Sequence, residues 1–176
     1  MRRLILFPAF LSILLSASCQ RHDRVVVQAT EENEEPELAS VIHVADPRVA
    51  HQLLRGFYDV EQNSWRWTMG KFTVVLRPPA GASVKGADLQ AKLSVPEAVI
   101  ARLQSLRLDA KIGEFALEGE TFLKAGEHTY RRAVPASVLG SDAVTVDFVL
   151  DKFLPPGNLD QRELGLVVST IGFEAK

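Results

Sequence analysis

The sequence has few of the residues that build cross-linked or metal-bound scaffolds: of 176 residues, one is cysteine and four are histidine. One cysteine cannot form an intramolecular disulfide, and it cannot supply a zinc or iron–sulfur cage. An excess of charge of one sign is also missing, because 20 Lys and Arg face 22 Asp and Glu, a formal net charge of −2. A nucleic-acid-binding surface normally needs a concentrated basic region. The composition therefore excludes a disulfide scaffold, a cysteine metal site and a nucleic-acid partner.

A long hydrophobic run is also absent. The apolar stretch Leu4–Leu15 follows the basic start Met1-Arg2-Arg3, and its 12 residues are too few to span a bilayer as a helix. Its length is typical of a signal peptide. Small residues then lead into Cys19, and the whole segment resembles a bacterial lipoprotein signal, although Ser16 stands where such signals prefer a branched apolar residue. The alternative is an ordinary secretory signal cleaved near a cysteine.

This resemblance implies a location. It makes residues 1–18 a signal peptide and Cys19 the acylated N-terminus, so that membrane lipid becomes a partner and no free thiol remains for catalysis. Gln20 follows the cysteine, whereas an Asp there tends to retain lipoproteins at the inner membrane. We therefore expect a bacterial envelope protein, with the outer membrane favoured. Residues 19–39 form the lipidated cysteine and an acidic tether, with net charge −4 over residues 20–39.

Residues 40–176 predict one domain, with 16 basic and 16 acidic residues. Apolar residues alternate with polar ones in several short stretches, as in half-buried strands. Strands are expected at 41–44, 64–68, 72–76, 89–95, 106–112, 115–117, 126–132, 144–150 and 164–173, and helical turns at 46–56, 96–104 and 135–139. The pattern predicts an all-β fold: an antiparallel β-sandwich of jelly-roll type with eight or nine strands and one or two short helices in the connections.

Chemistry-bearing motifs are scarce in this domain. It has no Gly-x-Ser-x-Gly elbow, no glycine-rich phosphate loop, and no pair of histidines spaced as metal ligands on one helix. We therefore expect no catalytic residue, metal or cofactor. The weakest alternative is a glycan hydrolase that uses an acidic pair such as Glu118 and Glu120.

Aromatic residues gather in one place, at residues 57–72. On a strand, Trp65 and Trp67 point to the same side and Arg66 to the other. If that side is the core, the tryptophans anchor the sandwich. If it is a groove, they form a stacking platform for a flat apolar ligand face, with Arg66 and Glu61 available for polar contacts.

A second cluster, Asp160-Gln161-Arg162-Glu163, precedes the last expected strand. One interpretation is an ion pair between Arg162 and Asp160 that fixes a loop. The other is a ligand site, because loops at the ends of such folds commonly bind ligands. The candidate ligand-binding residues from both clusters are Tyr58, Glu61, Trp65, Arg66, Trp67, Asp160, Arg162 and Glu163.

Together the motifs Gly56-Phe57-Tyr58, Trp65-Arg66-Trp67-Thr68 and Asp160–Leu166 resemble a β-sandwich module found beside glycosyltransferases in bacterial surface-polysaccharide systems, similar in outline to carbohydrate-binding jelly rolls. The resemblance implies a non-catalytic domain that binds a carbohydrate or a glycan-bearing surface. The alternative is a scaffolding lipoprotein that binds a protein of an envelope assembly.

Overall fold

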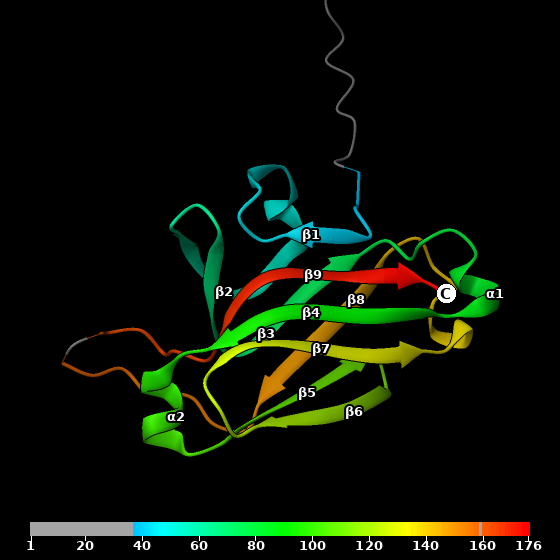
Figure 1. Ribbon diagram of the computed structural model, residues 1–176. Helices are drawn as coiled ribbons and strands as arrows, with labels where there is room; N and C mark the ends of the chain where they lie inside the picture. The colour runs from blue at the N-terminus through cyan, green and yellow to red at the C-terminus, as the bar shows by residue number, and fades with distance from the viewer. Residues whose placement is uncertain (1–36, 159) are drawn as a thin grey trace, which may run out of the picture. The chain divides into compact units, whose positions relative to one another are not determined.

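The computed structural model describes residues 37–158 and 160–176. These residues form nine strands joined by short connections (Figure 1). The strands are β1 (Val41–His43), β2 (Leu53–Glu61), β3 (Trp65–Leu76), β4 (Ala87–Val95), β5 (Leu106–Ile112), β6 (Phe115–Phe122), β7 (Gly126–Val134), β8 (Val144–Leu150) and β9 (Val167–Ala175). The helices are α1 (Ala82–Lys85), α2 (Glu97–Leu103) and the 3₁₀ turns η1 (Pro47–Gln52) and η2 (Ala136–Val138). The predicted all-β class, strand number and short connecting helices are confirmed.

All strand pairs are antiparallel, in the order β6-β5-β8-β3-β9-β4-β7, with β1 added to β9 and β2 added to β3. Strands β3 and β9 pair only through Arg66 with Val168 and Trp67 with Val167. At this short pairing of β3 with β9 the sheet folds over. Strands β9, β4 and β7 then lie side by side, while β8 crosses behind them (Figure 1). The result is a β-sandwich that approaches a barrel.

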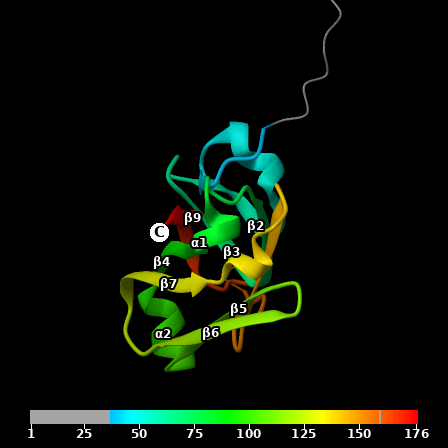
Figure 2. The same ribbon diagram turned by 90° about the vertical axis from the view of Figure 1, so that its right-hand side faces the viewer.

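Strands β6 and β7 are the two ends of this strand order, and Figure 2 shows both from the side. Side-chain hydrogen bonds join them. The Tyr130 hydroxyl donates to the Glu118 carbonyl oxygen at 3.0 Å, and Arg132 donates to the same oxygen at 2.7 Å. Burial of the phenol raises the pKa of Tyr130 to about 12, so its hydroxyl stays protonated and keeps donating. One buried and one partly exposed donor from β7 thus occupy a carbonyl oxygen on the β6 edge.

The core follows the alternation that the sequence predicts. Every second residue of β4, β5 and β8 is buried, and the residues between them face outward. Phe72 of β3 stacks on Phe148 of β8, with ring centroids 4.8 Å apart, and Phe57 of β2 meets Phe72 edge to face at 5.4 Å. Because the inner faces supply apolar residues at period 2, the outer faces are left polar.

Two local predictions were wrong. The expected helix over 46–56 ends at Gln52, and Leu53 begins strand β2. The expected strands at 64–68 and 72–76 were to be separated by a turn at residues 69–71, but β3 runs unbroken through these residues. In both cases pairing with a neighbouring strand outweighs the local signal: β2 pairs with β3 from Trp65 to Val74, and β3 also pairs with β8 from Lys71 onward.

Candidate functional site

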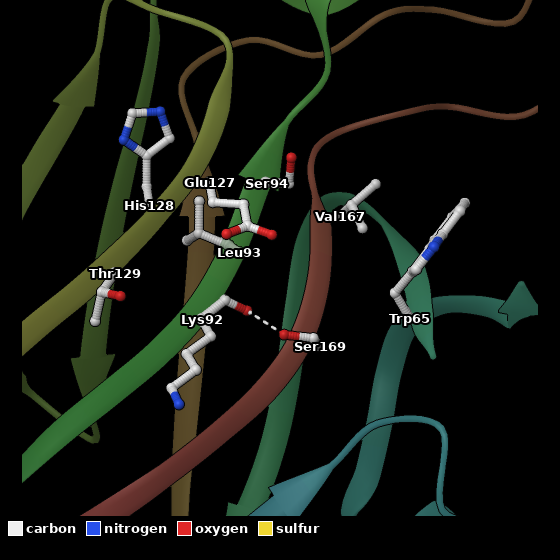
Figure 3. Close-up of a pocket in the computed structure, with 9 residues that line it drawn as sticks. All are labelled: Trp65, Lys92, Leu93, Ser94, Glu127, His128, Thr129, Val167 and Ser169. Carbon is white, nitrogen blue, oxygen red and sulfur yellow. Dashed lines mark hydrogen bonds between the residues drawn. The ribbon is translucent and has the colours of Figure 1, made fainter. Parts of the chain in front are cut away.

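A groove of about 460 Å³ lies on the outer side of strands β7, β4 and β9 (Figure 3). Trp65, at the start of β3, stands at one side of it, and polar side chains of the other three strands face it. The residues that line the groove are Trp65, Lys92, Leu93, Ser94, Glu127, His128, Thr129, Val167 and Ser169. The groove is therefore built by residues from four separate parts of the chain.

Strand register explains why these residues meet. Lys92 lies opposite Thr129, and Ser94 lies between Glu127 on β7 and Val167 on β9. Directly opposed residues on neighbouring strands share a face, so the outward positions of β4 line up with those of β7 and β9. Leu93, between Lys92 and Ser94, is buried in the core. The same alternation that fills the core thus places polar side chains of β4, β7 and β9 on the outer face, where they form the polar floor of the groove.

The floor is locally irregular at Ser169. The register between β4 and β9 shifts after Lys92, which leaves Ser169 as an extra residue on β9. Its hydroxyl donates to the Lys92 carbonyl oxygen at 3.3 Å, so the bulged strand stays attached to its neighbour (Figure 3). A bulge of this kind redirects a side chain, and here it brings a hydroxyl to the groove.

Lys92 and Glu127 are the two charged side chains of the groove. Neither forms an ion pair with any other residue in the part of the chain that the structure describes, although eleven ion pairs occur there. An ammonium donates and a carboxylate accepts, so the pair offers both kinds of hydrogen bond to a bound molecule. Their charges cancel, which suits a polar, uncharged ligand.

The two tryptophans lie edge to face, with ring centroids 6.4 Å apart and planes at 81°. Both are half-buried, yet their surroundings differ. Trp67 packs against the core cluster, whereas Trp65 lines the groove. Of the two alternatives open at the sequence level, the core role therefore falls to Trp67, and the groove position falls to Trp65.

The second predicted cluster comes together with part of the first. The Arg162 guanidinium contacts Glu61 at 2.8 Å and Asp160 at 2.9 Å, and it lies over the Tyr58 ring, 5.2 Å from its centroid. Hydrogen bonds from the Arg162 side chain and backbone hold the pKa of Asp160 below its ordinary value. The hydrogen bonds to Asp160 and Glu61 in turn raise the pKa of Arg162. Three of the predicted residues thus form one ion-pair cluster, and a fourth, Tyr58, lies under its guanidinium.

The remaining two predicted residues make hydrogen bonds within the fold. Arg66 donates to the Val44 and Tyr58 carbonyl oxygens, at 2.7 and 2.8 Å. The Glu163 carboxylate accepts from the Gly70 backbone N–H at 2.6 Å. These contacts attach the β2–β3 hairpin and the segment before β9 to the sandwich.

Asp160 and Arg162 also border a second hollow, of about 570 Å³, between α2 and residues 154–164. Three apolar side chains, Leu154, Pro155 and Leu164, form part of its wall together with Arg102 of α2. It shares no lining residue with the groove at Trp65. The predicted residues therefore contribute to two separate concave surfaces.

Sequence reasoning missed the polar floor of the groove: Lys92, Ser94, Glu127, Thr129 and Ser169. A signal was present, because these are the polar members of alternating stretches. However, the alternation does not say which strands are neighbours, and β4 pairs with strands that begin about 40 and 80 residues later.

Glu120, one acid of the pair considered for a hydrolase, and two of the histidines have partners within the fold. Glu120 pairs with Arg132 at 3.1 Å, the His43 ring nitrogen meets the Thr170 hydroxyl at 3.2 Å, and the His128 ring nitrogen meets the Lys124 carbonyl at 2.9 Å. Across residues 37–158 and 160–176, no three His, Cys, Asp or Glu side chains gather as metal ligands do. Within the same ranges, no helix has the length and apolar character needed to cross a bilayer.

No protein-family model matches this chain, and no curated protein matches it. Three solved structures resemble it. The CBM36-1 domain of a multidomain xylanase from the hindgut metagenome of Trinervitermes trinervoides is 12% identical, with a TM-score of 0.39 over 69% of this chain and 87% of that one. TmCBM27, a carbohydrate-binding module described for specific mannan recognition, is 10% identical, with a TM-score of 0.45 over 79% and 98%. A CBM4 structure is 10% identical, with a TM-score of 0.32 over 83% and 88%.

Proposed function

We propose that the domain is a non-catalytic carbohydrate-binding module and that its ligand lies in the groove beside Trp65. The observation that carries this proposal is the position of Trp65, an indole that stands at the side of a groove with a polar floor. A sugar ring has an apolar face of C–H groups and an edge of hydroxyl groups, and this groove offers a partner for each. Ligand sites commonly combine an aromatic wall with a few well-placed polar groups.

The floor side chains suit hydroxyl recognition. Glu127 accepts hydrogen bonds, Lys92 donates them, and Ser94, Thr129 and Ser169 do both. The row of strands β9, β4 and β7 extends the site by about 10 Å, at roughly 4.8 Å per strand spacing. A site of that width accommodates more than one sugar unit. A neutral oligosaccharide is therefore the preferred ligand.

The experiment is a titration of the domain, residues 37–176, with cell-wall and surface polysaccharide fragments and with xylan and mannan oligomers, followed by Trp fluorescence and by calorimetry. We expect saturable binding of at least one neutral oligosaccharide and loss of that binding in Trp65→Ala. Phe115→Ala is the matched control, because Phe115 is an aromatic side chain, 37% exposed, outside the groove. Absence of heat and of fluorescence change for every fragment would contradict the proposal.

The proposal includes a cellular location for the domain. We propose that Cys19 is acylated and that residues 19–39 tether the domain to a bacterial membrane, with the outer membrane favoured. Support comes from the sequence alone, since these residues lie outside the described ranges, except for the last three. Acyl chains add about 0.8 kcal/mol of membrane affinity per buried CH₂, so more than one chain anchors stably. Cys19→Ser should release the protein into the soluble fraction, and unchanged membrane association would contradict the anchor.

A further inference from the structure

The chain contains the same Asp-x-Arg turn twice. In Asp46-Pro47-Arg48, the arginine backbone N–H donates to the aspartate at 2.9 Å and its guanidinium approaches the same carboxylate at 2.7 Å. In Asp160-Gln161-Arg162 both distances are 2.9 Å. The local hydrogen-bond pattern is therefore common to both turns and does not distinguish Arg162.

What distinguishes Arg162 is a partner far away in the sequence. Its Nη1 atom donates to Glu61, 101 residues earlier, at 2.8 Å, and its guanidinium lies over the Tyr58 ring. Arg48 bonds only Asp46 among the described residues, and its side chain is 86% exposed. Arg162 thus joins the segment before β9 to strand β2, whereas Arg48 stabilises only its own turn.

Glu61 occupies a particular place on the β2–β3 hairpin. It lies directly opposite Trp65 in the register, at the end of the hairpin next to the turn. The register slips between Phe57 and Val60. Beyond this irregularity the β3 side of the hairpin pairs with β9 through Arg66 and Trp67, whereas β2 pairs with no strand other than β3 among the described residues. Two arginines add side-chain hydrogen bonds at this end: Arg66 donates to Val44 outside the hairpin and to Tyr58 within it, and Arg162 donates to Glu61 of β2.

We infer that Arg162 is a positioning residue for Trp65. Through Glu61 and Tyr58 it holds the hairpin end at one angle to the sandwich, and this sets the distance between the indole and the polar floor of the groove. Arg162 does not line the groove, so its effect on a ligand passes through the hairpin. The inference deepens the proposed function, because it names the residue on which the geometry of that site depends.

The geometry of the tryptophan pair provides a test that needs no ligand. Two indoles 6.4 Å apart and steeply inclined couple their electronic transitions, which gives a paired positive and negative signal in far-ultraviolet circular dichroism. Arg162→Gln should reduce this signal while the protein remains folded by thermal melting. Glu61→Gln should reduce it as well, and the double variant should reduce it no further than Arg162→Gln alone, because the contact between Arg162 and Glu61 is already lost in that single variant. Arg48→Gln, which alters the matched turn, should leave it unchanged.

Affinity is the second measurement. For whichever oligosaccharide the native domain binds, Arg162→Gln and Glu61→Gln should each weaken binding about tenfold, and Arg48→Gln should leave it unchanged. If the native domain binds no glycan, the proposed function fails, while the circular dichroism still decides the role of Arg162. A native dichroism signal in folded Arg162→Gln and Glu61→Gln would overturn the inference. Glu61→Gln alone decides it if Arg162→Gln does not fold.

Discussion

Trp65 and Trp67 lie edge to face at 6.4 Å, but only Trp67 packs against the core, and only Trp65 lines the groove. Two residues that are alike and almost adjacent in sequence thus have separate roles. The division predicts that they respond differently to the same substitution.

Trp67→Ala should lower the free energy of unfolding by about 2–3 kcal/mol, somewhat less than the ~3–5 kcal/mol typical of a fully buried aromatic, because Trp67 is only half-buried. Trp65→Ala should cost less than Trp67→Ala, because its ring borders the groove. Urea unfolding of both variants measures the difference. Equal losses of stability would show that Trp65 is a core residue and would remove the aromatic wall from the proposed site.

Gly56 should not tolerate a side chain. Its φ of +79° is in the left-handed region, and a Cβ there would overlap the Lys71 carbonyl oxygen of β3. Gly113 serves as the control, since its φ is +56° with open space around it. Gly113→Ala should cost about 1–2 kcal/mol from the backbone alone, and Gly56→Ala should cost clearly more. Similar unfolding midpoints for the two variants would contradict the close approach of β2 and β3.

Gln52 holds the beginning of the domain to the sandwich. This fully buried side chain accepts from the Ala39 N–H at 2.9 Å and donates to the Ala39 and Val75 carbonyl oxygens at 3.0 and 2.8 Å. Gln52→Leu keeps the size of the side chain and leaves these backbone groups without their partner, each at a cost of about 1–3 kcal/mol. We expect a total loss of at least 3 kcal/mol by urea unfolding. A loss below about 1 kcal/mol would be inconsistent with these contacts.

Stability should fall in acid partly through Asp147. A hydrogen bond from Thr73 and another from Arg55, at 2.7 and 2.8 Å, hold the pKa of this carboxyl below its ordinary value near 3.9. A carboxyl whose pKa is lower in the folded state stabilises above about pH 4 and loses that effect as the pH falls through the folded-state pKa. Native protein should therefore be more stable than Asp147→Asn at pH 7, and the difference should shrink below pH 4. A difference that stays constant from pH 7 to pH 3 would contradict this role.

Hydrophobic alternation predicted the sandwich well, because period 2 in β4, β5 and β8 follows directly from burial of one strand face. It failed at Gly56, which resembles the glycine that ends a helix. In the structure this glycine lets β2 approach β3 closely, because it has no Cβ to overlap the Lys71 carbonyl oxygen. That contact depends on a partner strand, which no local pattern reveals.

The candidate site was predicted in part for the same reason. The aromatic and Asp160–Glu163 clusters were visible as local groupings, and the structure joins them through Arg162 and Glu61. The floor of the groove was not visible, since Lys92 faces Thr129 and lies near Ser169 only after β4 has paired with β7 and β9. Strand order and register are properties of the whole fold.

The account depends most on the groove beside Trp65 as the place where a glycan binds. The most direct measurement is calorimetric titration of native protein, Trp65→Ala and Phe115→Ala with the oligosaccharide that the native domain binds best. We expect saturable binding by the native protein and by Phe115→Ala, and a loss of affinity of at least tenfold in folded Trp65→Ala. Unchanged affinity in folded Trp65→Ala would place the ligand elsewhere and contradict the account.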